Sequence, residues 1–339
     1  MLYFYFRITG LFLLLAGAAH GSDFLERDEV RQFIREVAAE HQLDQHRLAG
    51  HFTGLSSQQG IIDAISTPAE RTLTWGEYRA IFLKDKRIEQ GREFMAEHRA
   101  LLSRATEQYG VPATVITAII GVETFYGRIT GKHKVIEALA TLAFDYPPRA
   151  KFFRSELEEF LVLSTKEGWD PAQIKGSYAG AMGYPQFISS SYRQYAVDFD
   201  GDGKRDLHGN IADVIGSVAN YLAVHGWKAG APVASRWQTV AGEDVSDQAD
   251  IVALNRKSLK PQIALSTVKN LGYKPILPRA FDKAERDEEF VSVMPLEGLN
   301  KKETWVGYNN FYVITRYNHS RLYALAVLQL SDAIGDSSP

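Results

Sequence analysis

The chain has 339 residues, of which 45% are hydrophobic, 23% charged and 12% aromatic. This is the composition of a folded protein and not of a disordered one. Its 38 Lys and Arg residues stand against 41 Asp and Glu residues, and the formal charge of −3 provides no broad basic surface, so nucleic acid is not expected as a partner. The absence of cysteine excludes thiol nucleophiles, disulfides, Cys-ligated metal sites and a lipid anchor on an N-terminal cysteine.

The first 21 residues are typical of a secretory signal peptide. Arg7 precedes an apolar run from Ile8 to Ala19, and the small residues Ala19 and Gly21 suit a signal peptidase. This run of 12 residues is shorter than the ~18 needed to span a bilayer, which favours a cleaved signal over a retained membrane helix. We therefore expect an exported mature chain that begins near Ser22. ATP-driven chemistry is not expected outside the cytoplasm.

A helical domain is predicted for residues 22–109. Apolar residues recur there at the spacing of one helix face: Val30, Phe33, Ile34, Val37 and Ala38. Further along, Thr74 and Glu77 have the spacing of a capping box, which predicts the start of another helix.

A second, mostly helical unit is predicted for residues 110–229. Gly110-Val111-Pro112 interrupts the pattern, and Pro112 suits the first turn of a helix that continues to Gly127. Further helices are predicted at Val135–Phe144, Ala150–Ser164 and Asp213–His225, the last one ended by Gly226.

Residues 230–305 are predicted to form a small β-rich insertion. Its β-prone pieces alternate with Pro, Gly and charged turns, at Asp250–Leu254, Gln262–Val268 and Glu289–Met294. Residues 306–339 then return to the preceding unit, with a strand-like run at Phe311–Thr315 and helical spacing over Ser320–Leu330.

Glu123 is the candidate general acid. It follows Ile116 by seven residues and Ile119 by four, so its carboxyl lies on their apolar helix face. Desolvation there is expected to raise its pKa, as the general acid of glycosidic-bond cleavage requires. The spacing alone favours the other interpretation, a buried structural Glu held by an Arg or a helix N-terminus. The second carboxylate that most glycosidases use is not evident, which favours a mechanism with one carboxylate.

An acidic loop at residues 198–207 resembles a calcium-binding EF-hand loop. Asp198, Asp200, Asp202 and Asp206 occupy ligand positions 1, 3, 5 and 9, with glycine at position 6. Position 12 is Gly209 in place of the bidentate Glu, so we expect an enlarged loop whose last ligand is Asp213. The alternative is a solvated acidic turn without a cation.

Residues 175–187 combine three glycines with aromatic and polar side chains. Glycines let a ligand approach the backbone, and aromatic rings stack on sugar rings, but a tightly packed core loop would look the same. Other motifs are absent: His41, His46 and His51 do not share a helix face, and the sequence contains no H-E-x-x-H, P-loop or G-x-S-x-G motif.

Taken together, these motifs resemble the lytic murein transglycosylase B family. The resemblance rests on Gly-Val-Glu-Thr around Glu123, the segment Gly176–Phe187, the acidic loop and the segment Asn310–Ser320, in this order over nearly the whole mature chain. It implies a mainly α (α+β) fold: a lysozyme-like catalytic core with a helical N-terminal domain, a small inserted β-rich domain and an EF-hand-like calcium site.

The resemblance also assigns site residues. It makes Glu123 the only acid/base and puts Arg149 near the peptide stem or the acid. It implies that the glycan groove is lined by Ser177, Gly180, Met182, Gln186, Phe187, Tyr221, Tyr317, Asn318 and Tyr323. The chain departs from the family at Pro148, Pro185 and Phe125-Tyr126, which affects the expected subsite specificity and not the expected reaction.

The implied reaction cleaves the β-1,4 bond between N-acetylmuramic acid and N-acetylglucosamine and closes a 1,6-anhydro ring, with no catalytic cofactor and a structural Ca²⁺. A hydrolytic muramidase on the same fold and a non-catalytic peptidoglycan-binding scaffold are the alternatives. The expected partners are peptidoglycan glycan strands and other cell-wall enzymes. Since the chain lacks cysteine, a soluble periplasmic protein that is not a lipoprotein is expected.

Overall fold

The computed structural model describes residues 23–67, 72–239, 254, 259–276 and 289–336. The predicted signal peptide, residues 1–21, lies outside the described residues, and so does the predicted β-prone piece Asp250–Leu254 except for Leu254. Among the described residues, no helix is both long and apolar enough to cross a membrane.

The N-terminal region is helical, as predicted. Its elements are η1 (Phe24–Glu26), α1 (Asp28–His41), α2 (Gln45–Gly50), α3 (Gln59–Ser66), α5 (Trp75–Phe82), α6 (Asp85–Glu97) and α7 (Arg99–Tyr109). Helix α1 buries all five of the apolar residues that predicted it. The predicted capping box is confirmed, because the Thr74 side chain accepts from the Glu77 N–H while the Glu77 side chain accepts from the Thr74 N–H.

The four helices predicted between residues 110 and 229 are present. The elements of this stretch are α8 (Ala113–Thr124), β1 (His133–Lys134), α9 (Val135–Asp145), η2 (Pro147–Arg149), α10 (Ala150–Glu167), β2 (Lys175–Gly176), α11 (Ser189–Tyr195) and α12 (Ile211–Val224). Helix α8 ends at Thr124 and not at Gly127 as predicted, because Phe125, Tyr126 and Gly127 have left-handed φ angles of 53°, 59° and 84°.

The inserted β-rich segment forms one antiparallel five-stranded sheet in the order β4-β6-β7-β3-β5. Its elements are β3 (Ala234–Thr239), β4 (Ile263–Ala264), α14 (Leu265–Asn270), β5 (Tyr273–Pro275), β6 (Phe290–Glu297) and β7 (Lys302–Gly307). The sheet has a hydrophobic core of its own, built around Trp237, Val293 and Tyr308. The prediction for Glu289–Met294 is confirmed by β6, whereas Gln262–Val268 is a two-residue strand followed by α14.

The chain returns to the helical unit through α15 (Asn309–Tyr317) and α16 (Arg321–Gly335). The strand predicted at Phe311–Thr315 was wrong. Its aromatic and β-branched residues favour strands, but Phe311, Ile314 and Thr315 also have helical spacing and are buried on one helix face. Packing therefore overrides the local propensity. The predicted helix Ser320–Leu330 is confirmed by α16, which Ser320 caps.

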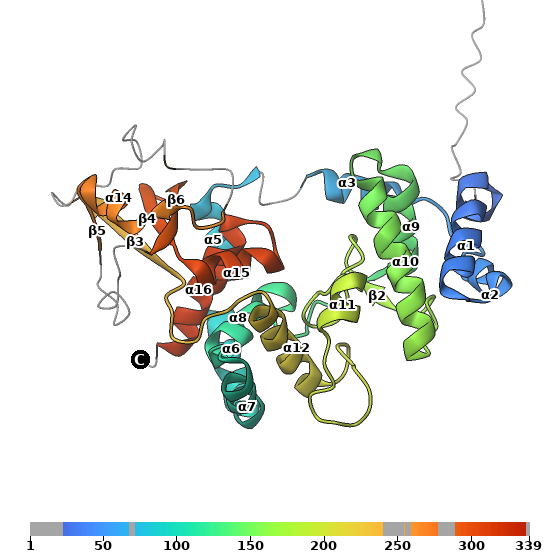
Figure 1. Cartoon of the computed structure of the whole chain (residues 1–339), viewed down its shortest axis with the longest axis horizontal. Coiled ribbons are helices and arrows are strands. Elements are labelled where there is room, and N and C mark those ends of the chain that lie inside the picture. The colour runs from blue at the N-terminus through green and yellow to red at the C-terminus, as the bar shows by residue number, and fades with distance from the viewer. Residues whose placement is uncertain (1–22, 68–71, 240–253, 255–258, 277–288, 337–339) are drawn as a thin grey trace, which may run out of the picture.

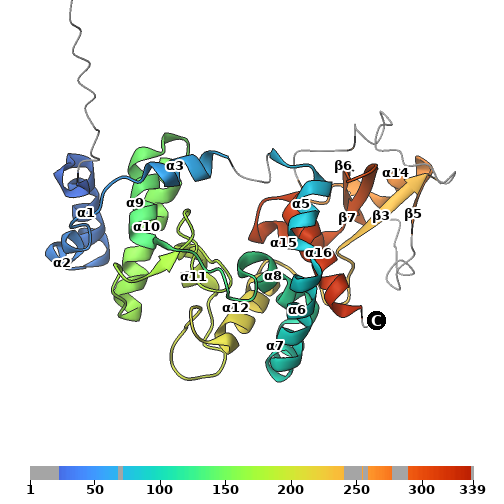
Figure 2. The same cartoon turned by 180° about the vertical axis from the view of Figure 1, so that it is seen from behind.

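The N-terminal helices contact two different parts of the chain. Helix α3 packs on α9, whereas α5, α6 and α7 pack on α16, α8 and α12. Figure 1 and Figure 2 show α1 and α2 beside α10, at the opposite end of the molecule from the sheet. Residues 22–109, predicted as one domain, are thus divided between two packing environments.

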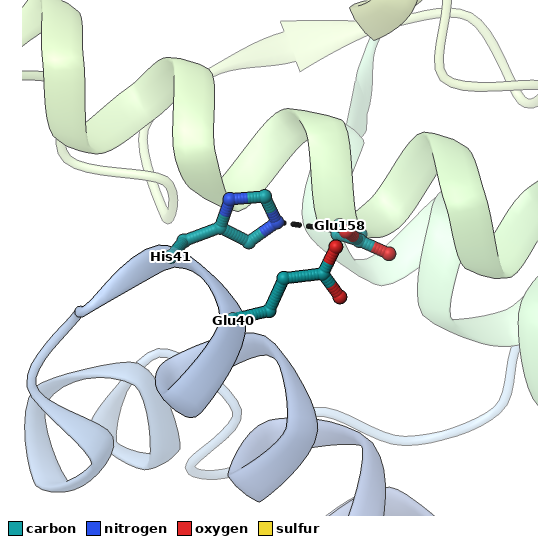
Figure 3. Close-up of side chains that lie close together, drawn as sticks. All are labelled: Glu40, His41 and Glu158. Carbon is teal, nitrogen blue, oxygen red and sulfur yellow. Dashed lines mark hydrogen bonds and ion pairs between the residues drawn. The ribbon is translucent and has the colours of Figure 1, made fainter.

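Two of the polar contacts between α1 and the helical pair α9 and α10 lie at the ends of α1. Arg27 pairs with Asp145 at 2.8 Å, and His41 Nε2 lies 2.8 Å from a Glu158 oxygen on α10. Figure 3 shows this second contact with Glu40 beside it. The carboxyl of Asp145, the last residue of α9, is therefore engaged in a structural ion pair.

The inserted sheet docks on α5 through a buried acid. Glu303 of β7 accepts hydrogen bonds from the indole N–H groups of Trp75, at 3.1 Å, and Trp305, at 2.9 Å. A Cβ added at Gly76 would lie 2.5 Å from the Leu299 nitrogen in the turn between β6 and β7. Only a glycine at this position of α5 allows so close an approach of the turn.

Candidate active site

Glu123 lies in the last turn of α8, and the residues after it fix the end of that helix. Thr124 Oγ1 donates to the Tyr184 carbonyl at 3.0 Å and accepts from the Gly127 N–H at 3.0 Å. A Cβ added at Gly127 would lie 1.9 Å from the Tyr184 ring, so glycine is required there. The sequence thus ends the helix sharply, one residue after Glu123.

Tyr323 of α16 donates a hydrogen bond to Glu123. Its hydroxyl donates to Glu123 Oε1 at 2.6 Å, and its ring stacks on Tyr317 with a centroid separation of 6.3 Å. Tyr317 in turn donates to the Pro185 carbonyl at 2.6 Å. Burial raises the pKa of both tyrosines well above the usual value, and the charge of Glu123 contributes. Both are therefore neutral donors, and Tyr323 stabilises the carboxylate form of Glu123.

Glu123 opens onto a cleft of about 1110 Å³. Aromatic rings form one wall: Tyr221 packs against Phe187, Tyr195 and Tyr317 with centroid separations of 5.5, 4.8 and 4.8 Å. The size of the cleft and its aromatic wall suit an extended sugar chain.

The structure brings most of the predicted groove residues into this cleft. Those that line it are Glu123, Arg149, Ser177, Gln186, Phe187, Tyr221, Tyr317 and Asn318. Gly180, Met182 and Tyr323 lie behind the wall instead. Met182 is fully buried and pairs with Phe187, while a Cβ added at Gly180 would lie 2.5 Å from the Leu139 side chain.

Ser177 and Gln186 shape the glycine-rich loop as well as lining the cleft. Ser177 Oγ accepts from the N–H groups of Ala179 and Ala181 at 3.3 and 3.1 Å. Gln186, with a left-handed φ of 50°, donates its amide to the carbonyls of Thr130 and Gly183 at 3.0 and 2.9 Å. The loop is therefore both a folded turn and part of the cleft wall, so the two interpretations of residues 175–187 do not exclude each other.

Several residues that line the cleft were not predicted from the sequence. Leu259 and Leu296 come from the inserted segment, and Arg316, His319 and Arg321 come from α15, α16 and the loop between them. Arg316 and His319 flank Tyr317-Asn318, which is a local signal for them. The two leucines have none, since only the docking of the sheet brings them to the cleft.

Glu123 is the one carboxylate that lines the cleft in the part of the chain that the structure describes. Another acid lies behind the wall. Glu156 is buried and accepts from the N–H and hydroxyl of Ser190 at 3.0 and 2.7 Å. Burial raises its pKa, and the hydrogen bonds from Ser190 oppose that rise. Glu156 thus fixes the start of α11 and does not face the cleft.

The acidic loop lies between α11 and α12. Asp198, Asp200 and Asp202 each offer a carboxylate oxygen, and these oxygens lie within 4.8 Å of one another. The Asp198 carboxylate also accepts from the N–H groups of Gly201 and Gly203, at 2.7 and 2.8 Å. Three adjacent exposed carboxylates on a turned loop suit a cation that prefers oxygen ligands.

The two remaining acids of the predicted metal site bind the backbone of the loop. The buried carboxylate of Asp213 accepts from the Phe199 and Asp206 N–H groups, both at 2.7 Å. Burial raises its pKa, and the charges of Asp200 and Asp198 contribute to the rise. Asp206 accepts from the N–H groups of His208 and Gly209, at 2.8 and 3.0 Å. Both acids therefore shape the loop.

The family model described as the Transglycosylase SLT domain matches residues 26–332, a range that contains the whole cleft. The chain belongs to this family. It is 37% identical over 324 residues to the membrane-bound lytic murein transglycosylase B of Escherichia coli (strain K12), covering 93% of this chain and 84% of that relative. The predicted resemblance is confirmed.

Solved structures of the family have the same fold. The soluble lytic transglycosylase SltB1 from Pseudomonas aeruginosa is 45% identical, with a TM-score of 0.81 over 90% of this chain and 98% of that chain. The Escherichia coli lytic transglycosylase Slt35 in complex with calcium is 37% identical, with a TM-score of 0.80 over 93% of this chain and 95% of that chain. The mainly α fold with a lysozyme-like core is thereby confirmed for this Transglycosylase SLT domain.

Proposed function

We propose that this protein is a peptidoglycan lytic transglycosylase that cleaves the β-1,4 bond between N-acetylmuramic acid and N-acetylglucosamine. The observation that carries the proposal is Glu123, which is the one carboxylate lining an aromatic-walled cleft among the described residues of a Transglycosylase SLT domain. A hydrolase of the usual kind needs a second carboxylate there.

Glu123 acts first as an acid and then as a base. As a carboxylic acid it protonates the leaving O4 of N-acetylglucosamine while the C1–O4 bond breaks, and the muramic acetamide supports C1. As a carboxylate it then takes the proton from the C6 hydroxyl while O6 bonds to C1 and closes the 1,6-anhydro ring. The proton moves from O6 to O4 by way of Glu123, and no water is consumed.

Tyr323 and the aromatic wall support these two steps. The hydrogen bond of 2.6 Å from Tyr323 stabilises the carboxylate that is present between proton transfers. The rings of Phe187, Tyr221 and Tyr317 offer apolar surfaces to the sugar rings, and Ser177, Gln186 and Asn318 supply polar groups for hydroxyls and acetamides.

We assign a structural Ca²⁺ to the acidic loop. Asp198, Asp200 and Asp202 would hold it. Asp206 and Asp213 would complete the set of acids around the ion. The charges of Asp198 and Asp200, which raise the pKa of Asp213, support a cation at this place. Bound calcium would neutralise the loop that connects α11 to α12, two helices that contribute Tyr195 and Tyr221 to the cleft.

We also infer that residues 1–21 direct export and that the mature protein acts in the periplasm on glycan strands, beside other cell-wall enzymes. The signal-like composition of residues 1–21 supports export. The absence of cysteine supports a form without a lipid anchor on an N-terminal cysteine.

Mass spectrometry of digested peptidoglycan tests the proposed reaction. The products are expected to end in 1,6-anhydro-N-acetylmuramic acid, lighter by one water than reducing-end products. Chiefly reducing ends would assign the protein as a hydrolytic muramidase. Undetectable cleavage, together with glycan binding that Glu123→Gln leaves unchanged, would assign it as a binding scaffold.

A further inference from the structure

A second cluster of possible metal ligands lies outside the acidic loop, where the end of α1 meets α10. It consists of Glu40 and His41, the last two residues of α1, and Glu158 in the middle of α10. Each side chain offers a carboxylate oxygen or an imidazole nitrogen, and these three atoms lie within 4.8 Å of one another. Figure 3 shows the side chains of Glu40 and His41 pointing from α1 towards Glu158. The fold thus brings together ligands that are 117 positions apart in the chain.

The charges of the cluster favour a divalent cation. His41 Nε2 lies 2.8 Å from Glu158 Oε1, and since a carboxylate only accepts, Nε2 carries the proton of this hydrogen bond. Glu40 adds a second carboxylate within a few ångströms of the first. Even a positively charged imidazole offsets only one of these two negative charges, whereas a divalent ion offsets both.

The C-terminal end of α1 attracts a cation as well. The last carbonyl groups of a helix have no partner within it, and together they carry a partial negative charge. Glu40 and His41 lie in this last turn, and the helix stops at Gln42, whose φ of 54° is left-handed. The backbone at the end of α1 and the two carboxylates therefore favour positive charge at the same place.

The imidazole decides which cation the cluster suits. Calcium and magnesium take oxygen ligands, whereas zinc binds imidazole nitrogen together with carboxylate oxygen. A tetrahedral zinc ion holds its ligand atoms about 3.4 Å apart, which is within the present spacing, and water can fill the fourth position. Glu40 is exposed, and the side chains of His41 and Glu158 are 25% and 30% exposed, so an ion can reach all three.

We propose that Glu40, His41 and Glu158 bind a zinc ion that ties the end of α1 to α10. The site is separate from the calcium site assigned to the acidic loop, and it does not depend on the reaction proposed for Glu123. On binding, zinc takes the place of the proton on His41 Nε2, and this proton passes to the solvent. Three metal–ligand bonds then join the two helices where one hydrogen bond joined His41 to Glu158.

Isothermal titration calorimetry with zinc chloride tests this site. The purified protein is first stripped of metal with a chelator and dialysed, and excess calcium is then added so that the acidic loop is occupied. The wild type is expected to bind one zinc ion per chain. Glu40→Gln keeps the hydrogen bond between His41 and Glu158 but removes a metal ligand, so it should weaken zinc binding at least ~10-fold. His41→Gln should weaken it about 10- to 100-fold.

Matched variants separate this site from other places where zinc could bind. His46→Gln removes an exposed histidine of α2 that is not part of the cluster, so it should bind zinc like the wild type. Asp198→Ala, in the acidic loop, should also keep its zinc binding. The Tm of each variant without zinc shows whether it is folded. Zinc should raise the Tm of the wild type and of His46→Gln, and it should leave that of His41→Gln unchanged.

Three results would overturn the proposal: no zinc binding by the wild type, zinc binding that Glu40→Gln and His41→Gln leave unchanged, or equal weakening by His41→Gln and His46→Gln. Calcium or magnesium that displaces zinc at equal concentration would also overturn it, because the imidazole is expected to favour zinc. The proposed reaction is tested separately, since Glu123→Gln should bind zinc like the wild type.

Discussion

Tyr323→Phe removes one hydroxyl from the surroundings of Glu123 and leaves the ring in place. The lost hydrogen bond measures 2.6 Å between the Tyr323 hydroxyl and Glu123 Oε1, and Tyr323 is 2% exposed. A hydrogen bond to a charged group contributes about 1.5–3 kcal/mol. If this contribution is realised in the transition state, kcat/KM should fall about 10- to 100-fold, since 1.36 kcal/mol corresponds to a factor of ten.

The pH profile distinguishes this role from a structural one. The Tyr323 hydroxyl favours the carboxylate over the carboxylic acid, so in the variant Glu123 should keep its proton to higher pH. The alkaline limb of the kcat/KM profile is then expected to move to higher pH. The assay is the release of soluble anhydro-muropeptides from purified peptidoglycan, measured across the pH range.

A matched control is available in the inserted sheet. Tyr308 is 1% exposed and its hydroxyl lies 3.1 Å from Ser235 Oγ, so Tyr308→Phe removes a comparable buried hydroxyl away from the cleft. Its activity should equal that of the wild type. If Tyr323→Phe keeps kcat/KM within twofold and the alkaline limb does not move, then Tyr323 does not support Glu123.

Three further outcomes are expected. Calcium at ~100 times its dissociation constant should stabilise the wild-type fold by about 2.7 kcal/mol and raise its Tm, whereas Asp198→Ala should show no such shift; equal shifts in thermal unfolding would contradict the loop site. Arg316→Gln should raise the pKa of His319 in an NMR titration, because the guanidinium charge lowers it; an unchanged pKa would separate the two groups. Gly76→Ala should destabilise the protein by about 1–3 kcal/mol in urea unfolding, because its Cβ would lie 2.5 Å from the backbone of the β6–β7 turn, whereas Gly60→Ala, with nothing within 4 Å, should not; equal stabilities would refute the tight docking.

The sequence predicted those parts of the fold that depend on local patterns. The five buried residues of α1 and the capping box at Thr74 involve neighbours within one or two helix turns, so their periodicity was sufficient. The error at Phe311–Thr315 has the opposite origin. Its strand propensity and its helical spacing conflict, and the buried contacts that decide between them come from distant segments.

The site was predictable to a similar extent. The spacing placed Glu123 on the isoleucine face of α8 but left open whether it is a general acid or a structural Glu, and it also indicated that Asp198, Asp200 and Asp202 lie together. The bond between Tyr323 and Glu123 joins residues 200 positions apart, so no local pattern reveals it. Arg149, Arg316 and His319 likewise line one cleft although Arg149 is more than 160 positions from the other two in the sequence.

Glu123→Gln tests whether Glu123 is the acid/base of the reaction, because glutamine has nearly the same shape but neither donates nor accepts the required proton. The measurement is the rate of anhydro-product formation from peptidoglycan, with the Tm of the variant as the control for folding. We expect a loss of more than ~10²-fold at an unchanged Tm. A folded variant that keeps more than about a tenth of the wild-type rate would contradict the assignment of Glu123 as the acid/base.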